Sequence, residues 1–187
     1  MHGRGPLRVL LTSRSPSARV AMGALMSALC WLFIAASGVL PTGRFFVLTL
    51  ASFVILVACH ELGLGGACLV YLVSSVLSFL WPGLFIAVIF ASSFGALPLL
   101  IVWLRGKMKP WAARLIVHAL MSILMLSLLW GVGVGVLLRI KWEISGTILI
   151  GILFLLLQIF LVIYSYALQM FERLYLERIA PWLHRRT

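Results

Sequence analysis

The sequence predicts an all-α, polytopic membrane helical bundle with six transmembrane helices. Hydrophobic residues make up 64% of the 187 residues and charged residues only 10%, whereas a soluble domain is about half apolar and a quarter charged. The charges are also segregated, because long uncharged stretches alternate with short basic ones. A bilayer imposes this pattern, since an ionised side chain at its centre costs about 2.5–3.5 kcal/mol or more.

Six apolar runs approach the length that a membrane helix needs, which is about 20 residues for a hydrocarbon core about 30 Å thick. They cover residues 20–40, 45–59, 67–80, 84–104, 115–138 and 144–167. The second and third runs are short, so a helical hairpin that does not fully cross is an alternative for them. We expect a basic tail over 1–19, a six-helix membrane domain over 20–179 and a basic C-terminal tail over 180–187, with the sixth helix continuing as an amphipathic end.

The distribution of Lys and Arg predicts that both termini are cytoplasmic (N-in/C-in). Arg44, Arg139 and Lys141 lie in the loops of one side, and the remaining twelve of the fifteen Lys and Arg residues lie on the side of the termini. Cytoplasmic loops retain basic residues. A cleaved signal peptide ending near Ala35-Ala36-Ser37 is the alternative reading of the first run, but the later apolar runs favour an uncleaved first helix.

The net charge of +11 predicts contact with anionic lipid on the cytoplasmic face. A nucleic-acid partner is not expected, because the basic residues are spread over several short loops. The three cysteines, Cys30, Cys59 and Cys68, lie in or near apolar runs without a Cys-x-x-Cys pair, so neither a disulfide framework nor a zinc site is predicted.

The acidic side chains that most membrane enzymes need are missing. The chain has no Asp and four Glu, so carboxylate-bound Mg²⁺ and aspartyl proteolysis are not expected. His60-Glu61 lacks the second histidine of a zinc-protease motif, because Leu64 stands at that position. His118 is read as a hydrogen-bonded helix residue, with a proton or metal site as the alternative. We therefore predict no enzyme activity, no cofactor and no metal.

Two groups of residues are candidates for function. Ala24 and Ala28 form a small-xxx-small motif in the first run, with Ala21 on the same face, and small residues let a partner helix approach closely; internal packing is the alternative. The second group lies toward the predicted outer ends of the helices, where cationic and polar side chains suit a small anionic ligand, although ordinary interfacial solvation explains them as well. This tentative ligand site comprises Arg44, Thr42, Trp81, Trp130 and Arg139.

Several short motifs resemble small bacterial membrane proteins related to the substrate-binding (S) components of energy-coupling factor (ECF) transporters. They are Ala-Met-Gly-Ala-Leu-Met-Ser-Ala at 21–28 through Leu-Pro-Thr-Gly-Arg at 40–44, Glu-Leu-Gly-Leu-Gly-Gly-Ala at 61–67, Tyr-Leu-Val-Ser-Ser at 71–75 and Ile-Tyr-Ser-Tyr-Ala-Leu at 163–168. The resemblance implies a six-helix subunit that captures a vitamin or similar micronutrient outside the cell. It implies a transmembrane coupling subunit and two ATPases as partners, with Ala21, Ala24 and Ala28 against the coupling subunit and the loop at 41–44 over the ligand.

From this resemblance we expect a membrane-embedded solute-binding subunit of an ATP-driven micronutrient uptake system in the bacterial cytoplasmic membrane. The alternative is a non-catalytic membrane scaffold or assembly subunit of the bacterial envelope.

Overall fold

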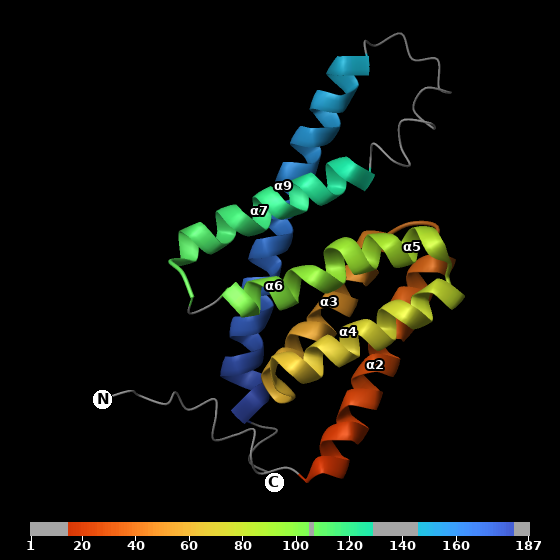
Figure 1. Ribbon diagram of the computed structural model, residues 1–187. Helices are drawn as coiled ribbons and strands as arrows, with labels where there is room; N and C mark the ends of the chain where they lie inside the picture. The colour runs from red at the N-terminus through yellow and green to blue at the C-terminus, as the bar shows by residue number, and fades with distance from the viewer. Residues whose placement is uncertain (1–14, 105–106, 129–145, 182–187) are drawn as a thin grey trace. The chain divides into compact units, whose positions relative to one another are not determined.

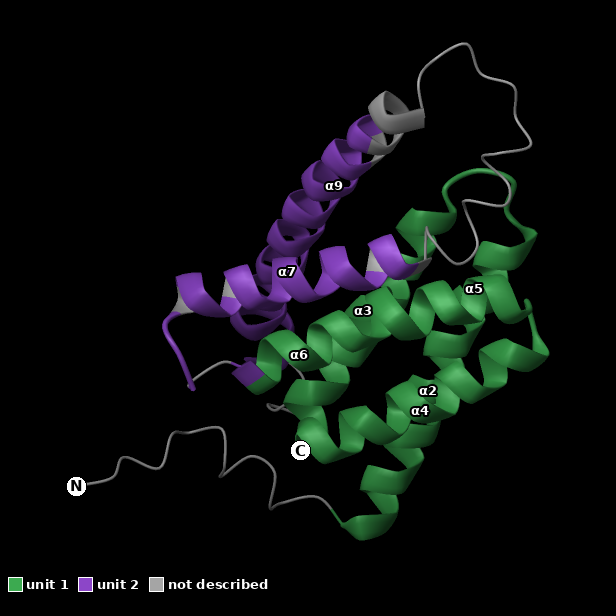
Figure 2. Cartoon of the chain, turned by 45° about the horizontal axis from the view of Figure 1, so that its top comes forward, with its two compact units in different colours: residues 1–103 green, residues 104–187 purple. Residues whose placement is uncertain are grey.

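The computed structural model describes residues 15–104, 107–128 and 146–181, and these ranges form helices and no β-strand (Figure 1). The chain divides into two compact units, residues 1–103 and 104–187 (Figure 2). The first contains α2 (Pro16–Val39), α3 (Arg44–Glu61), α4 (Gly63–Leu80), α5 (Leu84–Ile89), η1 (Phe90–Gly95) and α6 (Ala96–Leu104), which ends at the unit boundary. The second contains α7 (Pro110–Leu128), α9 (Gly146–Leu174) and η3 (Tyr175–Ile179).

The helices confirm a multi-pass membrane bundle. Five of them are long and apolar enough to cross a bilayer: Pro16–Val39, Arg44–Glu61, Gly63–Leu80, Leu84–Leu104 and Phe154–Ile179. The shorter apolar helix Trp111–Leu124 lies within α7. The two runs that looked short in the sequence become helices of 18 residues each, or about 27 Å at about 1.5 Å per residue. Both are therefore long enough to span.

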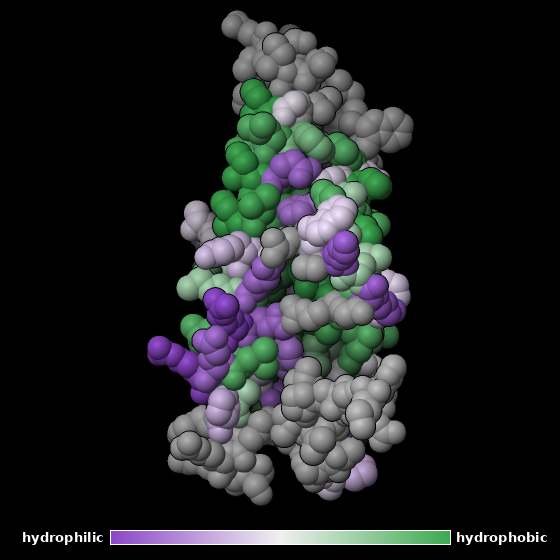
Figure 3. All heavy atoms as spheres, turned by 90° about the vertical axis from the view of Figure 1, so that its left-hand side faces the viewer, coloured by the Kyte–Doolittle hydropathy of each residue, from purple (hydrophilic) through white to green (hydrophobic). Residues whose placement is uncertain are grey.

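The surface of these helices is suited to lipid. Large hydrophobic side chains stand exposed along them, among them Leu80 (79% exposed), Val20 (72%) and Leu25 (71%). Figure 3 shows hydrophobic side chains, in green, on the outside of one face. Contiguous apolar surface of this kind is rare on soluble monomers. The exposed apolar side chains therefore face the hydrocarbon that the composition predicted.

Helix α2 starts four residues earlier than the apolar run predicted. Pro16 occupies its first turn, and the Ser15 hydroxyl accepts a hydrogen bond from the Ala18 amide at 3.4 Å. Serine is a favoured N-cap residue and proline is favoured in the first turn, where no intrahelical N–H bond is lost. As a result Arg19, expected in the basic tail, belongs to the helix.

Tight turns connect the first three helices. Gly43 before α3 and Gly63 at the start of α4 both have φ of 76°. This left-handed conformation is unfavourable for residues with a Cβ atom. The glycine-rich stretch after His60-Glu61 therefore reverses the chain at Leu62-Gly63 and then forms the first turn of α4.

The interior of unit 1 combines small and aliphatic residues of α2, α3 and α4 with the buried rings of Phe90 and Phe94 in η1. Ala58, Leu62, Ala67 and Val70 form one buried cluster together with Cys59. Two serine hydroxyls in this interior donate to backbone carbonyls, Ser52 to Leu48 at 3.0 Å and Ser78 to Ser75 at 2.6 Å, whereas the buried Ser75 hydroxyl has no hydrogen-bond partner among the described residues. Such bonds satisfy hydroxyls that hydrocarbon cannot. Ser74 makes the bond that joins two helices, since its hydroxyl donates to the Ser27 carbonyl at 3.3 Å.

The fourth span contains a π-helical segment, η1, between α5 and α6. The Tyr71 hydroxyl of α4 donates to the carbonyl of Ala91 in η1 at 2.9 Å. Gly95 makes room for this ring, because a Cβ atom at Gly95 would lie 2.6 Å from the ring atoms Cδ2 and Cε2 of Tyr71. A larger residue at this position would therefore have to displace the Tyr71 ring or the π segment.

In unit 2, α7 and α9 share a polar contact: the Gln158 side-chain amide donates to the Ser122 hydroxyl. α9 continues through η3, where Arg173 and Glu177 form an exposed ion pair at 3.5 Å. The predicted continuation of the sixth helix beyond residue 167 is thus observed.

We predict that Gly95→Ala destabilises the protein by about 1–3 kcal/mol, because the methyl group overpacks against Tyr71. The matched control is Gly65→Ala in α4, where a Cβ atom meets nothing within 4 Å; it should be neutral or stabilising, since alanine favours helix over glycine. Thermal unfolding of both variants in detergent measures the difference. Equal melting temperatures would contradict the described packing of Gly95.

Candidate functional site

A groove of about 650 Å³ lies between α2 and α4 in unit 1. Its volume falls within the range of roughly 300–1,000 Å³ typical of ligand pockets. Apolar side chains dominate its lining, and Arg19 at one end is the charged residue among them. The lining residues are Arg19, Val20, Gly23, Ala24, Ser27, Ala28, Leu62, Gly66, Leu69, Val70, Val73 and Leu77.

The two walls of the groove differ in the size of their side chains. On α2 the wall is low, because Gly23, Ala24, Ser27 and Ala28 recur at helical spacing. On α4 the wall is made by larger aliphatic residues such as Leu69 and Val73, both exposed at their outer edges. Because the side chains of α2 are short and those of α4 are long, the groove includes an apolar channel along α2, which we call the trough.

Leu62, between α3 and α4, closes one end of the groove. Its side chain is buried, and Gly66 makes room for it, because a Cβ atom at Gly66 would lie 2.5 Å from Leu62 Cβ; a Cβ atom at Gly23 would lie 3.7 Å from Leu62 Cδ1, in ordinary van der Waals contact. The Leu62 carbonyl also accepts a hydrogen bond from the Arg19 guanidinium at 3.3 Å. One residue therefore forms the apolar floor of this end and positions the cation above it.

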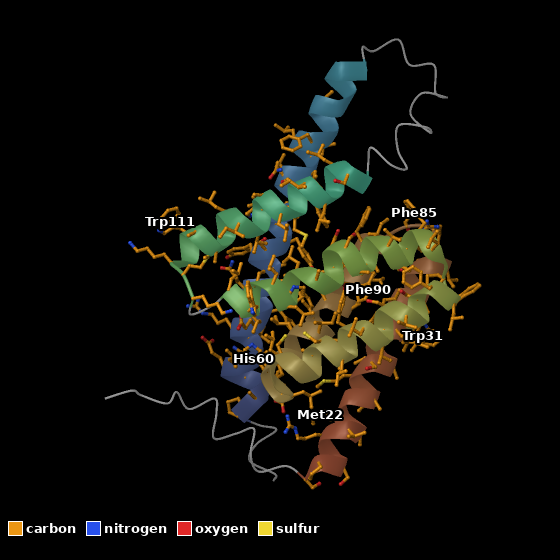
Figure 4. The ribbon with its side chains drawn as sticks, viewed as in Figure 1. Met22, Trp31, His60, Phe85, Phe90 and Trp111 are labelled. Carbon is orange, nitrogen blue, oxygen red and sulfur yellow. The ribbon has the colours of Figure 1, made fainter. Side chains whose placement is uncertain are left out.

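The structure brings two of the three predicted partner-contact residues into the groove. Ala24 and Ala28 are exposed and line it. Ala21 is exposed on the same helix but lies outside the lining, where Val20 and Gly23 take the corresponding places. The face of α2 that lines the groove therefore differs slightly from the face that Ala21, Ala24 and Ala28 would share. In Figure 4, Met22 marks this part of α2, and its partly buried side chain packs on the Ala58–Val70 cluster instead.

Three of the tentative ligand residues of the predicted outer end are described, and all three are exposed. Arg44 is exposed, and its Nε donates to the Leu40 carbonyl at 2.9 Å, so it caps the preceding helix end. Thr42 is exposed in the adjoining turn. Trp81 is exposed, and its carbonyl accepts from Trp31 Nε1 at 3.2 Å. Trp130 and Arg139 lie outside the described residues.

The histidine candidates do not assemble a site among the residues that are described. His60 and Glu61 end α3, and His118 is a half-buried residue of α7. Within 15–104, 107–128 and 146–181 no group of three His, Cys, Asp or Glu side chains could hold a metal ion.

Arg19, Leu62, Gly23 and Gly66 were not singled out in the sequence, although they shape the closed end of the groove. Gly23 and Ser27 do form a second small-xxx-small pair, which is a usable signal for a close helix approach. Arg19 and Leu62 are 43 residues apart, and no pattern in the sequence indicates their bond.

Comparison with protein-family models, curated proteins and solved structures finds no match for this chain.

We predict that Ala28→Leu changes the free energy of unfolding by no more than about 0.5 kcal/mol, because the added side chain enters the open groove. Ala58→Leu is the matched substitution, since Ala58 is fully buried in α3; overpacking there should cost about 1–3 kcal/mol. Thermal unfolding in detergent compares the two. A large loss of stability in Ala28→Leu would show that the groove is filled.

Proposed function

We propose that this chain is a non-catalytic, multi-pass membrane subunit of a larger assembly, and that a transmembrane helix of its partner docks in the α2–α4 groove. The observation that carries the proposal is the row of small residues along α2, in which Ala24 and Ala28 are exposed and Ser27 is buried; it lowers one wall of an apolar groove. Helices in lipid associate through close packing, because lipid tails are as apolar as leucine and no hydrophobic driving force acts between helices. A low wall of Ala24, Ser27 and Ala28 gives a partner backbone that closeness.

A different protein suits this groove better than a second copy of the chain does. In a symmetric dimer with two α2 helices packed in parallel, Arg19 of one copy would lie beside Arg19 of the other at the closed end. The net charge of +11 adds to that repulsion. A partner with neutral or acidic residues at this depth avoids the penalty.

The first specific form of the proposal is a solute-binding subunit of an ATP-driven micronutrient uptake system in the bacterial cytoplasmic membrane. It is favoured by the position of Ala24 and Ala28 in the groove, because the resemblance to S components assigns this motif to contact with a transmembrane coupling subunit. The energy source would then reside in that subunit's ATPases, and Arg44 with its neighbours would face the solute.

The second form is a scaffold or assembly subunit of the bacterial envelope. It is favoured by the outer end, where Arg44 bonds to its own preceding helix end and Thr42 and Trp81 are exposed. An S component needs convergent polar groups at that end, whereas a scaffold needs only the docking surface.

We predict that Ala24→Leu combined with Ala28→Leu reduces recovery of the partner at least tenfold, because the leucines raise the low wall of the groove. Affinity purification from native membranes in mild detergent, with quantitative mass spectrometry of co-eluting proteins, measures this. The control is Leu25→Phe with Leu29→Phe, which adds bulk to exposed residues of α2 that do not line the groove.

The identity of the recovered protein separates the two forms. A coupling subunit with its ATPases supports uptake, and envelope-assembly proteins support the scaffold. Unchanged recovery in the alanine variant, with the protein still folded, would remove the groove from the proposal.

A further inference from the structure

We propose that the α2–α4 groove is also a binding site for one anionic phospholipid of the cytoplasmic leaflet. The lipid phosphate lies on the Arg19 guanidinium, and one acyl chain lies in the apolar trough between Ala24 and Ala28 on α2 and Leu69 and Val73 on α4. The site combines a cation at one end with an apolar channel that leads away from it, and this is the division between headgroup and tail in a phospholipid.

The length of the groove corresponds to one leaflet. At about 1.5 Å per residue, the lining from Arg19 to Ala28 covers about 14 Å along α2, and the lining from Gly66 to Leu77 covers about 17 Å along α4. Half of a hydrocarbon core about 30 Å thick is about 15 Å. An acyl chain with its headgroup at Arg19 would therefore reach the end of the groove near the middle of the bilayer.

Arg19 lies at the depth where a headgroup is found. It is in the first turn of α2, four residues after the N-cap Ser15, and Leu62, whose carbonyl it binds, follows the last residue of α3. Both helix ends are on the side that the basic residues assign to the cytoplasm. Anionic lipids are concentrated in that leaflet and attract basic side chains near the surface.

The bond to Leu62 prepares the guanidinium for a phosphate. It uses one of the five N–H donors of arginine and fixes the side chain at the closed end of the groove. The side chain is exposed, so its other donors face outward. Guanidinium and phosphate form strong, charge-assisted hydrogen bonds, and a lipid with a net negative headgroup gains more from the single cation than a zwitterionic one does.

The lipid and the partner helix described above would use the same trough, so they exclude one another. The lipid then covers the low wall of α2 until the partner displaces it. This exclusion rests on the proposed function, whereas lipid binding itself does not.

Native mass spectrometry of the full chain in mild detergent tests the site, with dioleoyl phosphatidylglycerol and dioleoyl phosphatidylcholine as probes of equal chain length. We expect one phosphatidylglycerol to be retained, with phosphatidylcholine bound at least about tenfold more weakly. Arg19→Gln should lower phosphatidylglycerol affinity about tenfold, as expected for the loss of a charge-assisted bond. Arg178→Gln, at an exposed arginine in η3 on the same predicted side, should leave affinity unchanged.

A second variant tests the trough without altering charge. Ala28→Trp fills the channel, so it should lower the affinity for phosphatidylglycerol while thermal unfolding shows the fold intact. Equal retention of the two lipids, equal losses in Arg19→Gln and Arg178→Gln, or full retention in Ala28→Trp would each overturn the proposal.

The two proposals fail separately. Loss of lipid retention in Arg19→Gln supports the lipid site even where no partner protein co-purifies. Partner recovery that depends on Ala24 and Ala28, together with no preference for phosphatidylglycerol, supports helix docking and overturns the lipid site.

Discussion

The close approach of α2 and α4 is the contact on which the rest of unit 1 depends. Ser74 donates to the Ser27 carbonyl at 3.3 Å with both serines buried, and a hydroxyl in hydrocarbon has no water to replace such a partner. Small residues on α2 make this bond possible, because larger ones would hold the helices apart. The same small residues do not fill the space beside α2. The groove that we assign to a partner is therefore a consequence of the close packing of α2 and α4.

The end of the groove at Leu62 depends on close packing as well. Gly66 leaves room for the Leu62 side chain, and the Leu62 carbonyl accepts a hydrogen bond from Arg19. Arg19 is exposed, and this hydrogen bond holds it at the end of the groove. Packing, chain reversal at Gly63 and the position of the one cation in the groove are therefore consequences of a single local arrangement. That arrangement gives the groove a polar end and an apolar end, which is the property used in both proposals.

The sequence predicted the helices because a bilayer requires long uncharged apolar segments separated by short basic loops. It also indicated Ala24 and Ala28 as candidate contact residues, since small residues at helical spacing can be recognised in the sequence itself. The predicted start of α2 was four residues too late, because the prediction rested on apolar content alone. It did not use Ser15 and Pro16, which favour a helix start. It did not find the end of the groove, because the Arg19–Leu62 bond joins residues 43 positions apart. Ala21 does not line the groove. Which side of α2 faces the groove depends on how α2 packs against α3 and α4, and not on residue spacing alone.

Site-specific photo-crosslinking in living membranes tests the central claim, that the low wall of α2 is a surface for another protein, most directly. A benzoylphenylalanine replaces Ala28 in the groove, and in a second variant it replaces Val76, an exposed residue of α4 that does not line it. The account predicts that Ala28 yields one discrete protein adduct and that Val76 yields none of the same mass. Identical adduct patterns from the two positions, or protein adducts from Val76 alone, would contradict it.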